Sequence, residues 1–153
     1  MIDYLKDLEN ICKYKGIMDY VYPVLDDPCF ETWSGAGKLI HHHYGDGGLL
    51  KHTHEVFTYC SLIAAQYNGD CIDNTKRLNE NELFISVIWH DYGKIWDYQK
   101  NDNGVWGKHN NHARQIHHIS RSALEFQKHI IQLKSVLTLM LWLRFNQSYL
   151  RKI

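Results

Sequence analysis

Apolar side chains at helical spacing predict the first helices of the chain. Over about residues 2–15 they recur every three or four positions, which predicts an amphipathic helix with Ile2, Leu5, Leu8, Ile11 and Cys12 on one face. Residues 49–67 contain neither Gly nor Pro, which predicts a long helix. Another helix is expected to end at His90, after a cap at Asn79 or Asn81.

The pattern changes between and after these helices. Pro23 and Pro28 interrupt residues 16–47, which are predicted to be loop with one short turn. Asn103-Gly104 is a strong turn signal between aromatic runs and predicts a small β-hairpin near residues 96–106. Residues 69–79 are predicted to be loop, and two further helices are expected at about 111–128 and 130–146. The predicted fold is therefore all-α, with one small hairpin.

Composition indicates one soluble globular domain spanning residues 1–153. Hydrophobic residues make up 44% of the chain and charged residues 22%. The formal net charge is zero, so no global field attracts a long nucleic acid or a membrane. The longest apolar stretch, Ile130 to Phe145, is too short and too polar to span a bilayer and is predicted to be a buried helix.

The cysteines and the N-terminal residues favour a cytoplasmic protein. The four cysteines show no CxxC spacing, and Met1-Ile2-Asp3-Tyr4 lacks the basic segment and long apolar run of a secretory signal. Free thiols are therefore expected.

Eleven histidines are the compositional anomaly, and His90-Asp91 is their most informative member. The pair follows an apolar helical run and offers a nitrogen and a carboxylate ligand on one rigid support, which suits a metal site that activates water. His52 lies near the start of a predicted helix, just after Gly47-Gly48. His54, two residues further on, should point to another face, so His52 is the favoured ligand.

Other polar residues could join this site. Lys94 lies three residues after Asp91 and could neutralise a phosphate oxygen, although a surface ion pair is the alternative. His42 and His43 could contact a substrate phosphate or complete a second metal site, and an exposed loop of polar residues is the alternative. One of His117 and His118 could face this cluster and act as a ligand for a second metal ion.

Two other groups of residues have less certain roles. His109 and His112 have a spacing that would bring them close on a helix, where they could hold a zinc ion of their own. Trp96, Tyr98 and Trp106 in the predicted hairpin are candidates for contacting a nucleobase, whereas Trp33 and Trp89 are expected in the core.

Taken together, these segments resemble the HD-domain metal-dependent phosphohydrolases over about residues 24–127. The local sequences are similar to the branch that contains bacterial 3′–5′ exoribonucleases and small phage-encoded HD proteins. Three segments carry the resemblance: His42-His43 followed by Gly47-Gly48-Leu49-Leu50-Lys51-His52-Thr53, then His90-Asp91-Tyr92-Gly93-Lys94, and then His118-Ile119-Ser120-Arg121-Ser122.

The resemblance implies an HD-like helical bundle and a phosphohydrolase site. His52, His90 and Asp91 would hold a divalent metal ion, and His118 would bind a second, with Asp91 between them. Lys94 would hold the phosphate, so Asp91 and Lys94 are the expected catalytic residues, and Lys94, His42 and His43 the expected substrate contacts. One or two ions are implied, with Mn, Fe, Co, Ni, Mg and Zn all open. The expected substrate is a phosphoester of a nucleotide or short oligonucleotide, and a homo-oligomer is left open.

The C-terminal tail, residues 128–153, departs from the family pattern. The family continues with a His-His segment and a final metal-binding aspartate, whereas this chain has no acid after Glu125 and no histidine after His129. Either the chain is a truncated or frame-shifted member, or His129, Glu82, water or a partner subunit replaces the ligand. The alternative function is therefore a catalytically impaired HD fold that binds metal or nucleotide, or acts as an interaction module. A third possibility is a structural helical protein whose histidines bind zinc incidentally.

Overall fold

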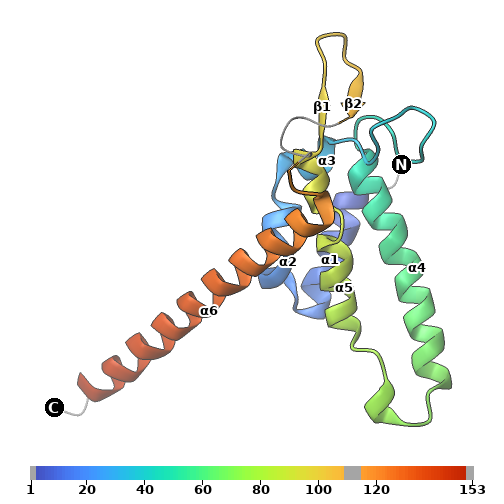
Figure 1. The fold of residues 1–153 in the computed structure, drawn as a ribbon. Coiled ribbons are helices and arrows are strands. Elements are labelled where there is room, and N and C mark those ends of the chain that lie inside the picture. The colour runs from blue at the N-terminus through green and yellow to red at the C-terminus, as the bar shows by residue number, and fades with distance from the viewer. Residues whose placement is uncertain (1–2, 109–114, 151–153) are drawn as a thin grey trace.

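The computed structural model describes residues 3–108 and 115–150, with side chains for 3–107 and 115–137. The described residues are mostly helical, with one small two-stranded sheet, as predicted (Figure 1). The α-helices are α1 (Tyr4–Lys15), α2 (Met18–Leu25), α3 (Pro28–Thr32), α4 (Gly48–Asp70), α5 (Glu80–Trp89) and α6 (His118–Leu150). Two 3-10 helices are η1 (Asn74–Lys76) and η2 (Tyr92–Trp96).

The hydrophobic core lies between α1, α2, α4 and α5. Its fully buried side chains come from each of these helices, and include Leu8, Val21, Leu49 and Ile88. Phe57 of α4 stacks on Phe84 of α5, with ring centroids 4.5 Å apart. This packing fixes α4 against α5, the two helices that carry the first histidines of interest (Figure 1).

The helices predicted from periodicity begin and end close to the predicted positions because capping residues mark their ends. The Asp3 carboxylate accepts a hydrogen bond from the Lys6 N–H, and Gly16 takes the left-handed conformation that ends α1. At the start of α5, Asn79 accepts from two backbone N–H groups, so Asn79 rather than Asn81 is the cap. The predicted long helix is α4.

The prediction of loop over residues 16–47 was wrong in its first half, where α2 and α3 form. Pro28 is the first residue of α3, where its missing N–H costs nothing, and Asp27 caps that helix. Pro23 lies within α2, and its missing N–H leaves the carbonyl of Asp19 without the usual helical partner. His129 of α6 supplies one instead, with Nε2 2.7 Å from the Asp19 carbonyl oxygen.

The prediction for the C-terminal part was also wrong in two respects. The chain forms one helix from His118, in place of two helices at about 111–128 and 130–146. The expected buried helix is exposed where its side chains are described, with Ile131, Val136 and Leu137 each at least half exposed. The cause is geometric, because α6 runs away from the helical body toward its C-terminal end (Figure 1).

The predicted hairpin is present as strands β1 (Tyr98–Lys100) and β2 (Trp106–Lys108), paired antiparallel. Trp106 is buried, packs edge-on against Trp33 and donates its indole N–H to Asp46. Trp89 lies in the core, as predicted, whereas Trp33 is only partly buried. The hairpin therefore uses Trp106 to fasten itself to the body.

Two findings bear on the expected class of the protein. In the part of the chain that the structure describes, no helix has both the length and the apolar content needed to cross a membrane. The four cysteines are free thiols, as predicted.

Candidate metal centre

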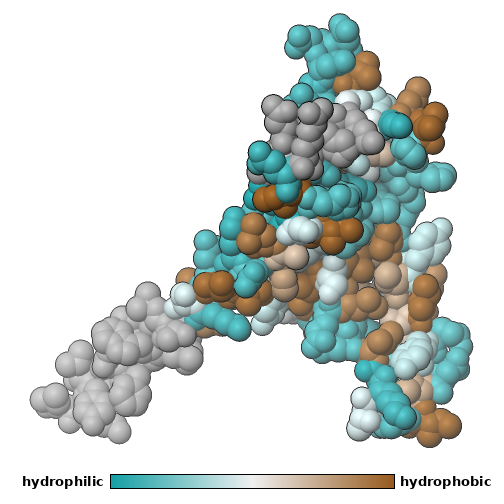
Figure 2. Space-filling view, viewed as in Figure 1, coloured by the Kyte–Doolittle hydropathy of each residue, from teal (hydrophilic) through white to brown (hydrophobic). Residues whose placement is uncertain are grey.

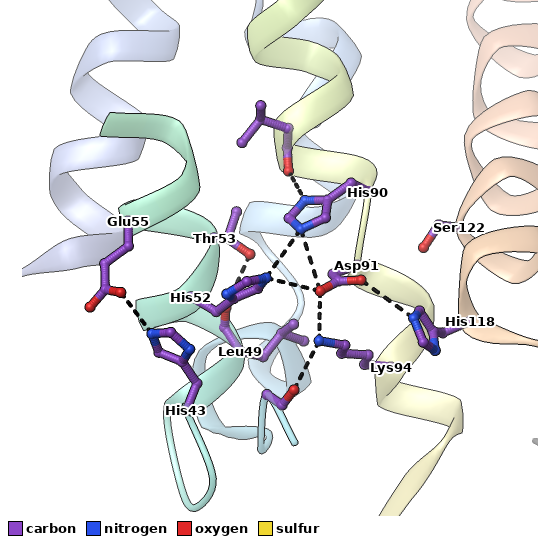
Figure 3. A network of polar contacts seen from close by, with 12 residues as sticks. His43, Leu49, His52, Thr53, Glu55, His90, Asp91, Lys94, His118 and Ser122 are labelled. Carbon is purple, nitrogen blue, oxygen red and sulfur yellow. Dashed lines mark hydrogen bonds and ion pairs between the residues drawn. The ribbon is translucent and has the colours of Figure 1, made fainter. Parts of the chain in front are cut away.

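His52, His90 and Asp91 converge at one point between α4 and α5 (Figure 3). The Nε2 atoms of His52 and His90 lie 3.1 Å and 3.3 Å from Oδ2 of Asp91, and 3.3 Å from each other. His52 comes from the second turn of α4, His90 ends α5, and Asp91 precedes η2. The structure therefore brings together the three ligands that the sequence predicted from segments 38 residues apart.

The spacing of these three atoms fits a bound cation. Two ligand atoms that share an ion at about 2.1 Å lie about 3.0–3.4 Å apart at octahedral or tetrahedral angles. All three separations here fall in that range. Two imidazoles and one carboxylate on one side of an ion leave its other positions open, which suits Zn²⁺ and first-row transition metals. The donor set therefore fits a divalent ion.

The backbone sets the orientation of the His90 ring. Its Nδ1 lies 2.6 Å from the carbonyl oxygen of Val87, which can only accept, so Nδ1 carries a proton and donates. Val87 lies in the last turn of α5, where carbonyl groups lack helical partners. In the neutral ring Nε2 then presents its lone pair to the cluster, as a metal ligand requires.

Lys94 lies against the same carboxylate oxygen. Its Nζ is 2.6 Å from Oδ2 of Asp91 and donates a second hydrogen bond, 2.9 Å long, to the carbonyl of Gly35. Both charged side chains are nearly buried, with about 10% of each exposed. The alternative of a surface ion pair is therefore excluded for Lys94, which is held inside the site.

His118 approaches the other oxygen of Asp91, with Nε2 3.6 Å from Oδ1. Its Nδ1 lies 2.8 Å from Oδ2 of the fully buried Asp97. Gly93 allows this approach, because a Cβ atom there would overlap the backbone of His118. Asp91 therefore faces His52 and His90 with one oxygen and His118 with the other, as a residue placed between two ions would.

Asp97 is a residue of the candidate site that the sequence did not reveal. Its hydrogen bond fixes the His118 ring, and such carboxylate–histidine pairs orient metal ligands in many sites. The only available signal was an acid enclosed by aromatic residues, Trp96 and Tyr98, in a segment predicted to form a hairpin. An acid in such surroundings needs a buried partner, but nothing in the sequence identifies His118 as that partner.

Electrostatics in the cluster favour a charged Asp91 carboxylate. Burial raises the pKa of Asp91, but hydrogen bonds from His52 and His90 and the positive charge of Lys94 outweigh it, so the pKa is far below its usual range. For His90, burial lowers the pKa, while the hydrogen bond and charge of Asp91 raise it more, leaving the pKa above the ordinary value. The site therefore holds a ready anionic ligand and a histidine that retains its proton to higher pH.

We expect the affinity for a divalent ion to weaken as pH falls, because a histidine ligand must lose its proton to bind. The raised pKa of His90 moves this competition to higher pH than for an ordinary histidine. Below that pKa the affinity should fall by about tenfold per pH unit for one competing proton. Calorimetric titration with Mn²⁺ from about pH 5.5 to about pH 8.5 measures this.

The stability of the metal-free protein should respond to pH in the opposite sense. A pKa raised on folding stabilises the folded state below the unfolded value and loses that contribution as pH rises through the folded value. In the calorimetric titration, a Mn²⁺ binding constant that does not change between about pH 5.5 and about pH 8.5 would contradict the assignment of His90 as a ligand.

The remaining predicted substrate contacts lie on the loop before α4. His43 has its ring 4.9 Å from that of His52 and its Nε2 2.8 Å from Oε2 of Glu55, whereas His42 is exposed beside it. His54 points away from the cluster and pairs with Asp7 of α1 at 2.7 Å, as the helical spacing predicted. His43 therefore borders the site and His54 does not.

Other candidates are placed elsewhere or are not described. His117 is exposed and its ring packs on that of His118. His129 contacts Asp19, and Glu82 accepts from Asn79 at the start of α5, so neither is positioned as a ligand of this cluster. His109 and His112, considered as a separate zinc pair, lie outside the described residues.

Comparisons with protein-family models, with curated proteins and with solved structures found no match to this chain. The geometry of the site is therefore the basis on which a function is proposed below.

Proposed function

We propose that this protein is a metal-dependent phosphohydrolase that cleaves a phosphoester of a nucleotide or short oligonucleotide. The observation that carries the proposal is the arrangement around Oδ2 of Asp91. Two imidazole nitrogens lie as far from this oxygen as two ligands of one shared cation would, and the ammonium group of Lys94 faces the same oxygen. Such a site offers a cation position and, directly beside it, a positive side chain that binds phosphate oxygens.

In the proposed reaction, water forms a bond to phosphorus while the ester P–O bond breaks. The leaving oxygen takes a proton, so the products are a phosphate and an alcohol, and no oxidant or reductant is required. A divalent ion, when bound, supplies a Lewis acid that polarises the phosphoryl oxygen and lowers the pKa of water.

The protein side chains hold and orient the reacting groups. His52, His90 and Asp91 would hold one ion, and His118 with the other oxygen of Asp91 would hold a second. Lys94 would donate to a phosphoryl oxygen and offset the charge that it gains in the transition state. The zero net charge of the chain supports a small substrate over a long nucleic acid, because long tracks are held by many phosphate contacts.

The test is metal removal followed by reconstitution of the full chain. Chelator-treated protein should be inactive, and Mn²⁺, Co²⁺, Ni²⁺, Zn²⁺ or Mg²⁺ should restore hydrolysis of nitrophenyl phosphoesters, nucleotides or short oligonucleotides. An Asp91→Asn variant purified identically controls for contaminating phosphatases. Stoichiometric ion binding without turnover would instead support the impaired, metal-binding alternative, and failure to bind any ion would refute both.

The role of Lys94 predicts a variant that separates ion binding from turnover. Lys94→Met removes a positive charge 2.6 Å from the ligand oxygen, so ion affinity should stay the same or increase. The value of kcat/KM should fall by about 100-fold, because a donor to the transferring phosphoryl group is lost. Ion titration and steady-state kinetics on the same preparation measure both effects.

Lys38→Met is the matched control, because Lys38 is exposed in the loop before α4, and this variant should retain full activity. Retained activity in Lys94→Met would show that Lys94 does not act on the phosphoryl group, and loss of ion binding in that variant with its helical content intact would show that Lys94 positions the metal ligands instead.

A further inference from the structure

A groove with a volume of about 410 Å³ opens between α5 and α6, directly beside the metal centre. Its surface is mostly apolar, although the neighbouring cluster is charged. The α5 wall contains Trp89, and the α6 wall contains Ile119, Ala123 and Phe126. Apolar side chains gather on the surface where α6 leaves the helical body (Figure 2).

The groove exists because two facing helical stripes do not close on each other. Ile119, Ala123 and Phe126 recur at spacings of four and three, so they share one face of α6. Facing apolar stripes of neighbouring helices normally interdigitate at high density. Here Phe126 packs on Trp89, with ring centroids 5.5 Å apart, whereas Ile119 near the start of α6 is 61% exposed. The facing stripes are therefore in contact at Phe126, whereas Ile119 near the start of α6 stays open to solvent.

The position of the ligands determines what kind of molecule can fill the groove. His90 and Asp91 belong to both the metal cluster and the groove wall, so a molecule in the groove borders the metal cluster. One end of such a molecule must suit two imidazoles, a carboxylate and Lys94, and the other must suit aromatic and aliphatic carbon. A phosphoester that carries a flat ring with apolar faces meets both requirements.

The size and the few polar groups of the groove fit the same description. Ligand pockets for small molecules range from about 300 to about 1,000 Å³ and combine apolar walls with a few polar contacts. Ser122 is buried at the inner end, where its hydroxyl oxygen accepts a 2.7 Å hydrogen bond from the Gly93 N–H. Its hydroxyl hydrogen can then donate to an acceptor on the ring.

We infer that the groove between α5 and α6 binds the nucleobase of the phosphoester substrate. This inference rests on the proposed function, because it places the base next to the bond that the metal centre cleaves. The sequence favoured Trp96, Tyr98 and Trp106 as base contacts, and this inference places the base elsewhere. Trp106 is buried and hydrogen-bonded to Asp46.

Filling the groove tests the inference without touching the metal ligands. Ala123 is exposed on the α6 wall, so Ala123→Trp should occupy the groove while leaving the core intact. With Mn²⁺ bound, the Kd of a phosphonate analogue of adenosine 5′-monophosphate, which has no ester bond to hydrolyse, should rise at least tenfold, while the Kd of inorganic phosphate and of Mn²⁺ should not change. Ser86→Trp, on the exposed end of the α5 wall, should have the same effect.

Ala65→Trp is the matched control, because Ala65 is exposed on α4 and does not line the groove. These binding measurements do not depend on turnover, so the inference can fail while the phosphohydrolase activity stands, and the reverse. Equal affinity of the wild-type protein for the nucleotide and for phosphate would overturn it. The inference would also be overturned if Ala123→Trp or Ser86→Trp changed the oligomeric state and left the nucleotide affinity unchanged, because another polypeptide would then cover the groove.

Discussion

His52→Ala is expected to weaken binding of the divalent ion by about 100-fold or more and to abolish phosphoester hydrolysis. Three ligand atoms would hold the ion on the protein side, and the variant leaves only His90 and Asp91. Loss of a group that merely orients a ligand already costs about 10- to 100-fold in affinity, so loss of a ligand should cost at least as much. Metal content after dialysis and kcat on a nitrophenyl phosphoester measure the two effects.

His54→Ala is a control that differs by only two positions on the same helix. His54 pairs with Asp7 on another face of α4, and both residues are remote from the ion position. This variant should retain stoichiometric metal and full activity, with at most a small loss of stability from an exposed ion pair. Equal losses in the two variants would mean that any histidine change in α4 disturbs the protein, and the assignment of His52 would then lack support.

Local signals predicted the long elements of the fold. The uninterrupted run that became α4 and the Asn79 cap of α5 each act within a few residues, so the sequence shows them directly. The prediction failed for α2, because Pro23 was expected to keep its segment in a loop. Its cost there is offset by His129, whose ring reaches the freed Asp19 carbonyl from 110 residues away. A local pattern cannot show such a partner.

The candidate site divides in the same way. His52, His90 and Asp91 were predicted ligands from their residue types and positions and from the resemblance of their segments to a known family, and the structure brings their ligand atoms together. Hydrophobic spacing alone would not have joined α4 to α5 at this point. Asp97 was missed because its role depends on His118, which follows the hairpin and lies 21 residues further along the chain. Contacts of this kind come from packing, and Gly93 is the residue that allows this one.

Gly93→Ala is therefore expected to lower the free energy of unfolding by about 3 kcal/mol and to detach His118 from the metal centre. The added methyl group would overlap the carbonyl oxygen of His118, which is backbone and cannot rotate away. Forcing atoms into a packed contact typically costs about 1–3 kcal/mol, and backbone overlap places this site at the upper end. Urea denaturation measures the loss, and metal content should fall if His118 holds a second ion.

Gly69→Ala is expected to change the free energy of unfolding in the opposite direction. Gly69 lies in α4 with no atom close to the position of an added Cβ, so alanine should stabilise that helix by up to about 1 kcal/mol. If Gly93→Ala were as stable as the wild-type protein, the start of α6 would have to move freely away from η2. The start of α6 sets both the hydrogen bond of His118 to Asp97 and the groove between α5 and α6. Such a result would therefore mean that the close contact of Gly93 with His118 does not hold either feature in place.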